Sequence, residues 1–356
     1  MYLGIGLYKN MLTTENYRFA RQCGCTHVVA HLANYYVNDI VPTTDQTRNY
    51  GRTTQDDELW RYDHLRALRE EIEAEGLRLH AIENFSPNHW YDVLLDGPRK
   101  VEQMAHLKAI IRDVGRAGIP VFGYNFSVAG VWGHTQRPVA RGGAFTACYD
   151  HLDGGAAYPI PNGQVWNMTY ADDAPAGFVP PTSPEALWAR CQWFLDELLP
   201  VAEEAGVKLA AHPDDPPMPV IRGQARLVHQ PSLYQKLLDL HPSPSNCFEF
   251  CLGSLQEMRE GDAYAAIARY APMDKLAYVH FRNVQGKVPR YQETFVDDGD
   301  IDMMKALSLL KASGYKGVLI PDHTPQMTCA APWHSGMAFA LGFMRAALRA
   351  IDAEEG

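Results

Sequence analysis

The sequence lacks the features of a membrane protein. Its 356 residues contain no apolar run of about 18 side chains, the length that a transmembrane helix requires. Residues 1–7 carry neither a basic leader nor a small-residue cleavage site, and we expect them to form a strand. We therefore predict a cytoplasmic protein with no membrane partner.

Runs of basic residues are also absent. The formal net charge is −10 at pH 7, and no stripe of Lys or Arg is available to contact phosphates. These features argue against a nucleic-acid partner. They remain compatible with a small anionic substrate, because such a ligand needs only a local basic pocket.

A disulfide framework is not expected either. The number of cysteines is seven, which is not even, the chain is long, and it has no secretion signal. Cys23 and Cys25 are separated by one residue, whereas common zinc and redox motifs separate their cysteines by two. We therefore interpret this pair as structural.

Apolar extended segments alternate with amphipathic helical ones along the chain, which is typical of βαβ units. Strands are predicted at about 2–8, 26–31, 77–83, 120–126, 207–212, 247–251, 276–280 and 317–322. Helices are predicted at about 13–23, 57–75, 97–117, 184–205, 231–239, 262–270, 300–314 and 335–352. Eight strand–helix units predict an α/β protein with a (β/α)8 TIM barrel that spans residues 1–356 as one domain.

An open doubly wound sheet is the alternative fold. It would require a Gly-rich phosphate-binding turn after an early strand. Gly4 and Gly6 lie inside the first predicted strand, and no third glycine follows at the right spacing. The closed barrel is therefore the better interpretation.

Two segments interrupt the βαβ rhythm. A polar loop is expected between the second strand and about residue 56, and residues 127–182 form a long insertion after the fourth strand. The insertion is rich in Gly, Pro, Asn and aromatic residues. A connection of that length favours a lid or binding loop, although it would serve equally well in a subunit contact.

Four predicted strands in the second half of the chain each end in a side chain that can bind a divalent metal. The four side chains are His212, Cys251, His280 and Asp322. A closed parallel barrel brings the C-terminal ends of its strands to one rim, so we expect these groups to converge. Imidazole, thiolate and carboxylate together can hold a transition-metal ion. Taken singly, each also has a structural explanation, and the hypothesis depends on their joint position.

Further polar residues are expected at the same rim. Arg282 shares a strand face with His280 and is predicted to grip a substrate carboxylate, with a salt bridge to a loop acid as the alternative. His323 is a candidate general acid or base, or a partner that orients Asp322. Candidate substrate-binding residues near this rim are Glu83, Asn84, Asn125, Trp132 and Asp214.

Several strings of the sequence together resemble the mannonate dehydratase family, whose barrel is allied to that of xylose isomerase-like enzymes. They are Gly-Tyr-Asn-Phe at 123–126, Ala-His-Pro-Asp-Asp-Pro-Pro at 211–217, Phe-Cys-Leu-Gly-Ser-Leu at 250–255, His-Phe-Arg at 280–282, Asp-Gly-Asp-Ile-Asp-Met at 298–303 and Pro-Asp-His at 321–323. They occur in order and span about residues 77–345.

The resemblance implies the dehydration of D-mannonate to 2-keto-3-deoxy-D-gluconate. It also implies a Mn²⁺ site, with the family's ligands falling on His212, Cys251, His280 and Asp322, and it places the acid/base histidine on His323. Ligand softness alone favours Zn²⁺ at a site that contains a thiolate, and Fe²⁺ and Co²⁺ are further alternatives. A homo-oligomer is a further expectation from the resemblance.

Some substrate-facing positions depart from the family pattern. Thr324 stands where the family has Gly, and His334 lies near the position of a functional Tyr. The family's Asp-Trp-x-Arg-Thr motif appears as Val-Trp-Gly-His-Thr at 131–135, without its Asp or Arg. We therefore consider His334 as a catalytic candidate and His134 as a substrate-binding one.

These departures leave two alternatives to a mannonate dehydratase. One is a related metal-dependent isomerase, epimerase or lyase that acts on another polyhydroxy or keto-sugar. Its chemistry also begins with removal of a proton next to a carbonyl or carboxyl group, so the sequence separates the two poorly. The other is a sugar-binding or regulatory protein in which the metal is absent or structural.

Overall fold

The computed structural model describes residues 1–35, 51–53, 57–151 and 158–353. Most of the polar loop expected before residue 56 therefore lies outside the described residues. Within them, eight parallel strands form a closed barrel, which confirms the predicted (β/α)8 fold. Its strands are β1 (Tyr2–Leu7), β2 (His27–Ala30), β3 (Arg78–Glu83), β4 (Val121–Tyr124), β9 (Lys208–Ala211), β12 (Asn246–Cys251), β13 (Leu276–His280) and β16 (Val318–Ile320).

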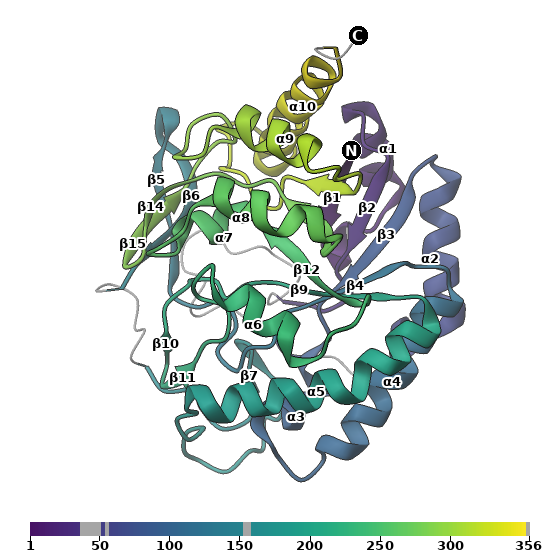
Figure 1. Cartoon of the computed structure of the whole chain (residues 1–356), viewed down its shortest axis with the longest axis vertical. Helices are drawn as coiled ribbons and strands as arrows, with labels where there is room; N and C mark the ends of the chain where they lie inside the picture. The colour runs from purple at the N-terminus through teal and green to yellow at the C-terminus, as the bar shows by residue number, and fades with distance from the viewer. Residues whose placement is uncertain (36–50, 54–56, 152–157, 354–356) are drawn as a thin grey trace.

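The first and last strands close the barrel. Tyr2 of β1 pairs with Val318 of β16, and Gly4 pairs with His27 of β2 on the other side. Every neighbouring pair in the ring is parallel, so all eight C-terminal ends lie at one rim (Figure 1). Gly4 is suited to this seam because an added Cβ would lie 2.7 Å from the Val318 side chain.

Helices surround the barrel. They are α1 (Thr14–Cys23), α2 (Tyr62–Ala74), α3 (Tyr91–Leu95), α4 (Lys100–Arg116), α5 (Pro184–Ala205), α6 (Leu233–Leu240), α7 (Leu252–Glu257), α8 (Ala263–Tyr270), α9 (Met303–Ala312) and α10 (Pro332–Ala353). Short 3-10 turns are η1 (Lys9–Met11), η3 (Asp57–Trp60), η4 (Pro87–His89), η5 (Arg141–Gly143) and η6 (Ala271–Met273). None of these helices is long and apolar enough to cross a membrane.

The helix ends follow the capping signals of the sequence. Ser183 accepts a hydrogen bond from the Ala186 amide at the start of α5, and Pro184 occupies the first helical position. At the other end Gly206 adopts the left-handed conformation, at φ 69°. Local sequence therefore sets where this strand–helix unit turns back toward the barrel.

The barrel interior changes character along its axis. Small and branched side chains fill the middle of the barrel, including Val29, Ala81, Val121, Ala210 and Ala277. Larger apolar residues, such as Phe122 and Leu198, pack in the layer between the barrel and its helices. Compact packing below leaves room at the C-terminal rim for polar side chains.

The long insertion is more regular than its composition suggests. It contains the hairpin β5 (His134–Ala140) and β6 (Ala144–Asp150) and the short pair β7 (Gln164–Val165) and β8 (Met168–Thr169). β6 pairs with β15 (Arg290–Glu293), which pairs with β14 (Val284–Lys287), so two distant loops form one antiparallel sheet at the left of Figure 1. Another short pair is β10 (Val220–Ile221) and β11 (Gln224–Ala225). The lid role assigned to residues 127–182 stays a prediction.

Candidate active site

A cavity of about 160 Å³ opens at the C-terminal rim of the barrel. Its walls come from the strand ends and from the antiparallel sheet above them. The lining residues that the barrel strands and their immediate loops supply include Tyr8, His31, Glu83, Asn84, Asn125, His212, Asp215, His280, Asp322 and His323. The two inserted loops add residues that include His134, Gln136, Thr146, Trp166 and Glu293.

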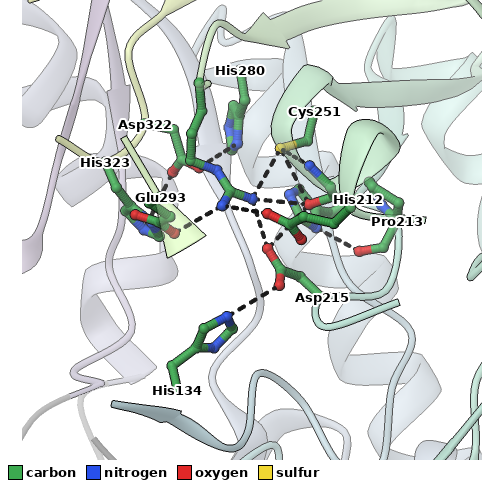
Figure 2. A network of polar contacts seen from close by, with 12 residues as sticks. His134, His212, Pro213, Asp215, Cys251, His280, Glu293, Asp322 and His323 are labelled. Atoms are coloured by element: carbon green, nitrogen blue, oxygen red, sulfur yellow. Dashed lines mark hydrogen bonds and ion pairs between the residues drawn. The ribbon is translucent and has the colours of Figure 1, made fainter. Parts of the chain in front are cut away.

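Three of the predicted metal ligands converge beside this cavity, which His212 and His280 line. One ligand atom from each of His212, Cys251 and His280 lies within 4.8 Å of the other two. Figure 2 shows His280 between Cys251 and Asp322, and Oδ2 of Asp322 lies 3.3 Å from Nδ1 of the histidine. Three of the four side chains therefore form one group, and the fourth, Asp322, contacts it through His280; metal binding by the four stays a prediction.

The donor set fits a divalent metal. His280 is 2% exposed, and neither of its ring nitrogens has a hydrogen-bond partner of good geometry among the described residues. Nδ1 of His212 lies 2.6 Å from the Pro213 carbonyl oxygen, which fixes the ring and leaves its other nitrogen for Cys251. An imidazole held at one nitrogen in this way is typical of a metal ligand.

The electrostatics favour a thiolate at Cys251. Burial opposes ionisation, but Arg282 and the two histidines hold the pKa of the Cys251 thiol well below its ordinary value. Its sulfur also accepts from the Ser254 amide at 3.4 Å, at the start of α7, and a helix N-terminus favours negative charge. The thiolate is the form of cysteine that binds metals.

A pair of carboxylates lies beneath His280. Nε2 of His280 is 3.0 Å from Glu249 and 3.6 Å from Glu83, and Tyr278 donates a hydrogen bond to Glu83 at 3.0 Å. Burial and the neighbouring Glu83 raise the pKa of Glu249 to about 7. Gly123 makes this packing possible, because an added Cβ would lie 2.5 Å from the Tyr278 hydroxyl and 2.6 Å from Glu249.

Arg282 organises the wall of the site. Its guanidinium group donates to Glu257 at 2.9 Å, to Glu293 at 2.8 Å and to Asp215 at 2.7 Å. Its Nε lies 3.1 Å from Asp322, and Nη2 also donates to Ser254 and to the Cys251 sulfur. Both terminal nitrogens of the side chain thus donate to protein acceptors, whereas Nε has only the ion pair with Asp322.

Gly253 explains how so large a side chain is accommodated. A Cβ at this position would lie 2.8 Å from the Arg282 Nε. The glycine of the Cys-x-Gly-Ser string therefore leaves space for the guanidinium group. Arg282 is not among the residues that line the cavity, and its contacts match the salt-bridge alternative; its contact with a substrate stays a prediction.

His323 is held at the cavity edge by two carboxylates. Its Nδ1 lies 3.0 Å from Glu293 and its Nε2 3.4 Å from Asp322, while its side chain remains 43% exposed. Burial would lower the pKa of His323, but Asp322 and Glu293 raise it to about 9. The ring lines the cavity, and its role in proton transfer stays a prediction.

His134 belongs to a second network of hydrogen bonds. Its Nε2 lies 2.7 Å from the Tyr291 hydroxyl, which in turn donates to Asp215 at 2.8 Å. Figure 2 places His134 beyond Asp215, away from the metal ligands. This imidazole links the inserted sheet to the Arg282 network.

The other residues predicted from the sequence divide by whether they line the cavity. The cavity is lined by Glu83, Asn84, Asn125 and His134 but not by Trp132, Asp214 or His334. The side chains of these last three contact other parts of the protein instead.

Asp214 accepts from the Leu227 and Val228 amides and forms a 2.6 Å ion pair with Arg226. The Arg222 guanidinium lies 3.7 Å from the centre of a Trp132 ring. Asp214 and Trp132 thus hold the loops that follow β4 and β9 in place and do not face the cavity.

His334 lies near the start of α10 and faces α1. Its Nε2 is 2.9 Å from the Asn16 side-chain oxygen, and its ring packs edge-on against Phe19. Both partners belong to α1, so this histidine joins two surface helices. Trp333 and Met337 of the same helix face the cavity instead.

Sequence reasoning missed several cavity residues. His31 directly follows β2 at the same rim as the metal ligands, so its strand-end position was the available signal. Glu249 contacts His280 but is not among the lining residues; it lies two residues before Cys251, and strand alternation places it on the same inward face. Tyr35, Trp166 and Glu293 belong to loops whose approach to the cavity had no local signal.

Comparisons with known proteins agree on one family. The chain matches the family described as D-mannonate dehydratase (UxuA) over residues 22–172 and 181–347. It is 31% identical to a mannonate dehydratase of Streptococcus equi subsp. zooepidemicus over 274 residues, which cover 74% of each protein.

Solved structures give the same result. The crystal structure of a mannonate dehydratase from Streptococcus suis serotype 2 superposes with a TM-score of 0.76 at 26% identity, over 98% of this chain and 94% of that one. A xylose isomerase domain protein from Planctomyces limnophilus shares the fold, with a TM-score of 0.60 at 14% identity over 99% of both chains.

Proposed function

The chain belongs to the mannonate dehydratase family of hydro-lyases, and from this premise we propose that it converts D-mannonate to 2-keto-3-deoxy-D-gluconate and water. We further propose that the reaction depends on a divalent metal held by His212, Cys251, His280 and Asp322. The single observation that carries this proposal is the convergence of His212, Cys251 and His280 beside the cavity, with Asp322 3.3 Å from His280.

The charge of the cavity supports metal dependence. Among the described residues that line it, none is Lys or Arg, although the proposed substrate is an anion. Arg282 is occupied by protein carboxylates, so it does not supply the missing charge. Bound at this site, a divalent cation supplies the positive charge that a sugar-acid carboxylate and a developing enediolate require.

Mn²⁺ is the proposed ion, with Fe²⁺, Co²⁺ and Zn²⁺ as alternatives that the same ligands would accept. A thiolate with two imidazoles and a carboxylate suits several of these ions, so metal availability contributes to the choice.

Proton transfer is assigned to His323. Because Glu293 holds Nδ1, the proton is exchanged at Nε2, on the opposite edge of the ring. In its neutral form, which the raised pKa makes the minor form at pH 7, His323 takes the C2 proton. The resulting imidazolium delivers that proton to the departing C3 hydroxyl, which leaves as water. The enol that remains then tautomerises to the 2-keto product.

The remaining cavity groups are proposed to orient the substrate. Asn84 and Asn125 lie at the ends of adjacent strands, and the side-chain oxygen of Asn84 is buried without a hydrogen-bond partner among the described residues. An unpaired buried oxygen is a suitable acceptor for a sugar hydroxyl. His134 and Gln136 would contact the substrate from the inserted sheet.

The direct experiment removes and restores the metal. Protein stripped with a chelator is expected to be inactive on D-mannonate, and Mn²⁺ is expected to restore formation of the 2-keto-3-deoxy acid, followed by proton NMR. Cys251→Ser should lose both metal and activity. Cys247→Ser is the matched control, because Cys247 is also buried on β12 but donates to the Pro244 carbonyl outside the site.

Two results would separate the alternatives. Metal-dependent consumption of D-mannonate without a 2-keto-3-deoxy product would favour an isomerase, epimerase or lyase. Full activity in the stripped protein would refute metal dependence while leaving the dehydratase assignment intact.

We also propose a cytoplasmic homo-oligomer. Val139 and Phe145 of the β5–β6 hairpin are 46% and 43% exposed, and an exposed apolar pair on an inserted hairpin is suited to a subunit contact. Light scattering after size exclusion measures the assembly, and a monomeric mass at micromolar concentration would refute it.

A further inference from the structure

A second cluster of potential metal ligands lies outside the barrel. Asp57 belongs to η3, His89 to η4 and His106 to α4. One ligand atom from each lies within 4.8 Å of the other two. None of the three lines the cavity of the candidate active site, so this cluster is independent of the proposed dehydration chemistry.

The cluster contains polar atoms without partners. His89 is 3% exposed, and its Nε2 lies 3.0 Å from Asp57 Oδ1. Among the described residues, the buried Nδ1 of His89 and the buried Nε2 of His106 have no hydrogen-bond partner. Buried polar atoms are nearly always satisfied in native proteins, so the unpaired Nε2 of His106, in a cluster where Nε2 of His89 faces Asp57, suggests a missing ligand.

The surroundings favour neutral imidazoles. The two rings lie 4.8 Å apart, and Trp60 packs edge-on against His89 at 5.0 Å. Burial lowers the pKa of His89 to about 4 and also lowers the pKa of His106. Neutral imidazole is the form that binds a metal.

We propose that Asp57, His89 and His106 bind a Zn²⁺ ion that stabilises the fold. Two imidazoles and one carboxylate, with water as the fourth ligand, are a donor set that zinc accepts. Ligand atoms around a tetrahedral zinc lie about 3.4 Å apart, so the side chains must close slightly from the observed spacing. The Asp57 side chain is 47% exposed, which lets it move and leaves an open position for water.

The site would join three segments that are separate in the sequence. η3 and η4 both contact α4, and η4 closely follows the rim residues Glu83 and Asn84 on the chain. A metal at this point would hold the connection after β3 against the helical layer. We therefore expect an effect on stability and only a small one on catalysis.

The experiment measures zinc bound by the full-length protein after titration and removal of free metal. His106→Gln and the milder surface substitution Asp57→Asn should each bind about one equivalent less than wild type. His241→Gln is the matched control. His241 also pairs with a carboxylate, Asp196, at 2.7 Å, but among the described residues no third potential ligand joins this pair. This control should bind as much zinc as wild type.

Cobalt distinguishes the two sites. Co²⁺ at the Cys251 site gives a thiolate charge-transfer band, which His106→Gln and Asp57→Asn should leave unchanged. Zn²⁺ should also raise the melting temperature of wild type and His241→Gln more than that of the two site variants. Equal zinc content and equal zinc-induced shifts in wild type and both site variants would overturn the proposal, whether or not the catalytic site binds metal.

Discussion

Replacing Arg282 with methionine tests whether this arginine positions the site or binds the substrate. The substitution keeps an apolar stem and removes all five N–H donors. It leaves Asp215, Glu257 and Glu293 buried without their shared cation. Asp322 and Cys251 lose the same partner.

The size of the effect follows from burial. The Arg282 side chain is 1% exposed, and breaking a buried ion pair by removing one partner costs about 3–5 kcal/mol. Unfolding entropy scales with length and is about 0.75 kcal/mol per kelvin for 356 residues. The melting temperature should therefore fall by about 4–7 °C.

Thermal unfolding followed by circular dichroism provides the assay. Arg141→Met is the control, because Arg141 forms a 3.1 Å pair with Asp297 and its side chain is 48% exposed. Exposed pairs contribute about 0–1 kcal/mol, so the control should shift by about 1 °C or less. If Arg282→Met melts like the control and only the KM for D-mannonate rises, Arg282 binds substrate and the positioning role is wrong.

Three further predictions test other parts of the structure. Glu293→Gln should lower kcat by about 10–100-fold, because it removes the carboxylate that orients His323, and an unchanged kcat would contradict that role. Gly123→Ala should destabilise the protein by about 1–3 kcal/mol in denaturant titration, since its Cβ would lie 2.5 Å from the Tyr278 hydroxyl; wild-type stability would show that the barrel adjusts without cost. Burial lowers the pKa of His27 to about 4, so the folded state resists protonation; stability should be fully present above about pH 6.5 and fall toward pH 4 by up to about 1.4 kcal/mol per pH unit. His27→Gln should flatten that acid-side slope, and an unaltered slope would assign acid sensitivity to other groups.

Local sequence was sufficient for most secondary structure. The predicted strand at 276–280 and helix at 184–205 agree with β13 and α5 at both ends. Periodicity and capping residues are local signals, and they survive in the fold because tertiary contacts agree with them. The count of eight strand–helix units then predicted the closed barrel.

The insertion shows where local reasoning ended. Residues 127–182 were predicted to be a lid or binding loop inserted after the fourth strand, and the strands β5 and β6 that form a hairpin within them were not predicted. β6 is stabilised by β15, which lies about 140 residues further along the chain. A strand whose partner is so distant carries no reliable mark in its own sequence.

The sequence by itself determined which side chains stand at the strand ends. A strand's direction and its alternation of faces are local properties, so the positions of His212, Cys251, His280 and Asp322 could be read directly. What each neighbouring group does was decided only by the tertiary structure. Arg282 turned toward the protein's own carboxylates and His334 toward α1, because the nearest opposite charge or acceptor belongs to a segment far away in the chain.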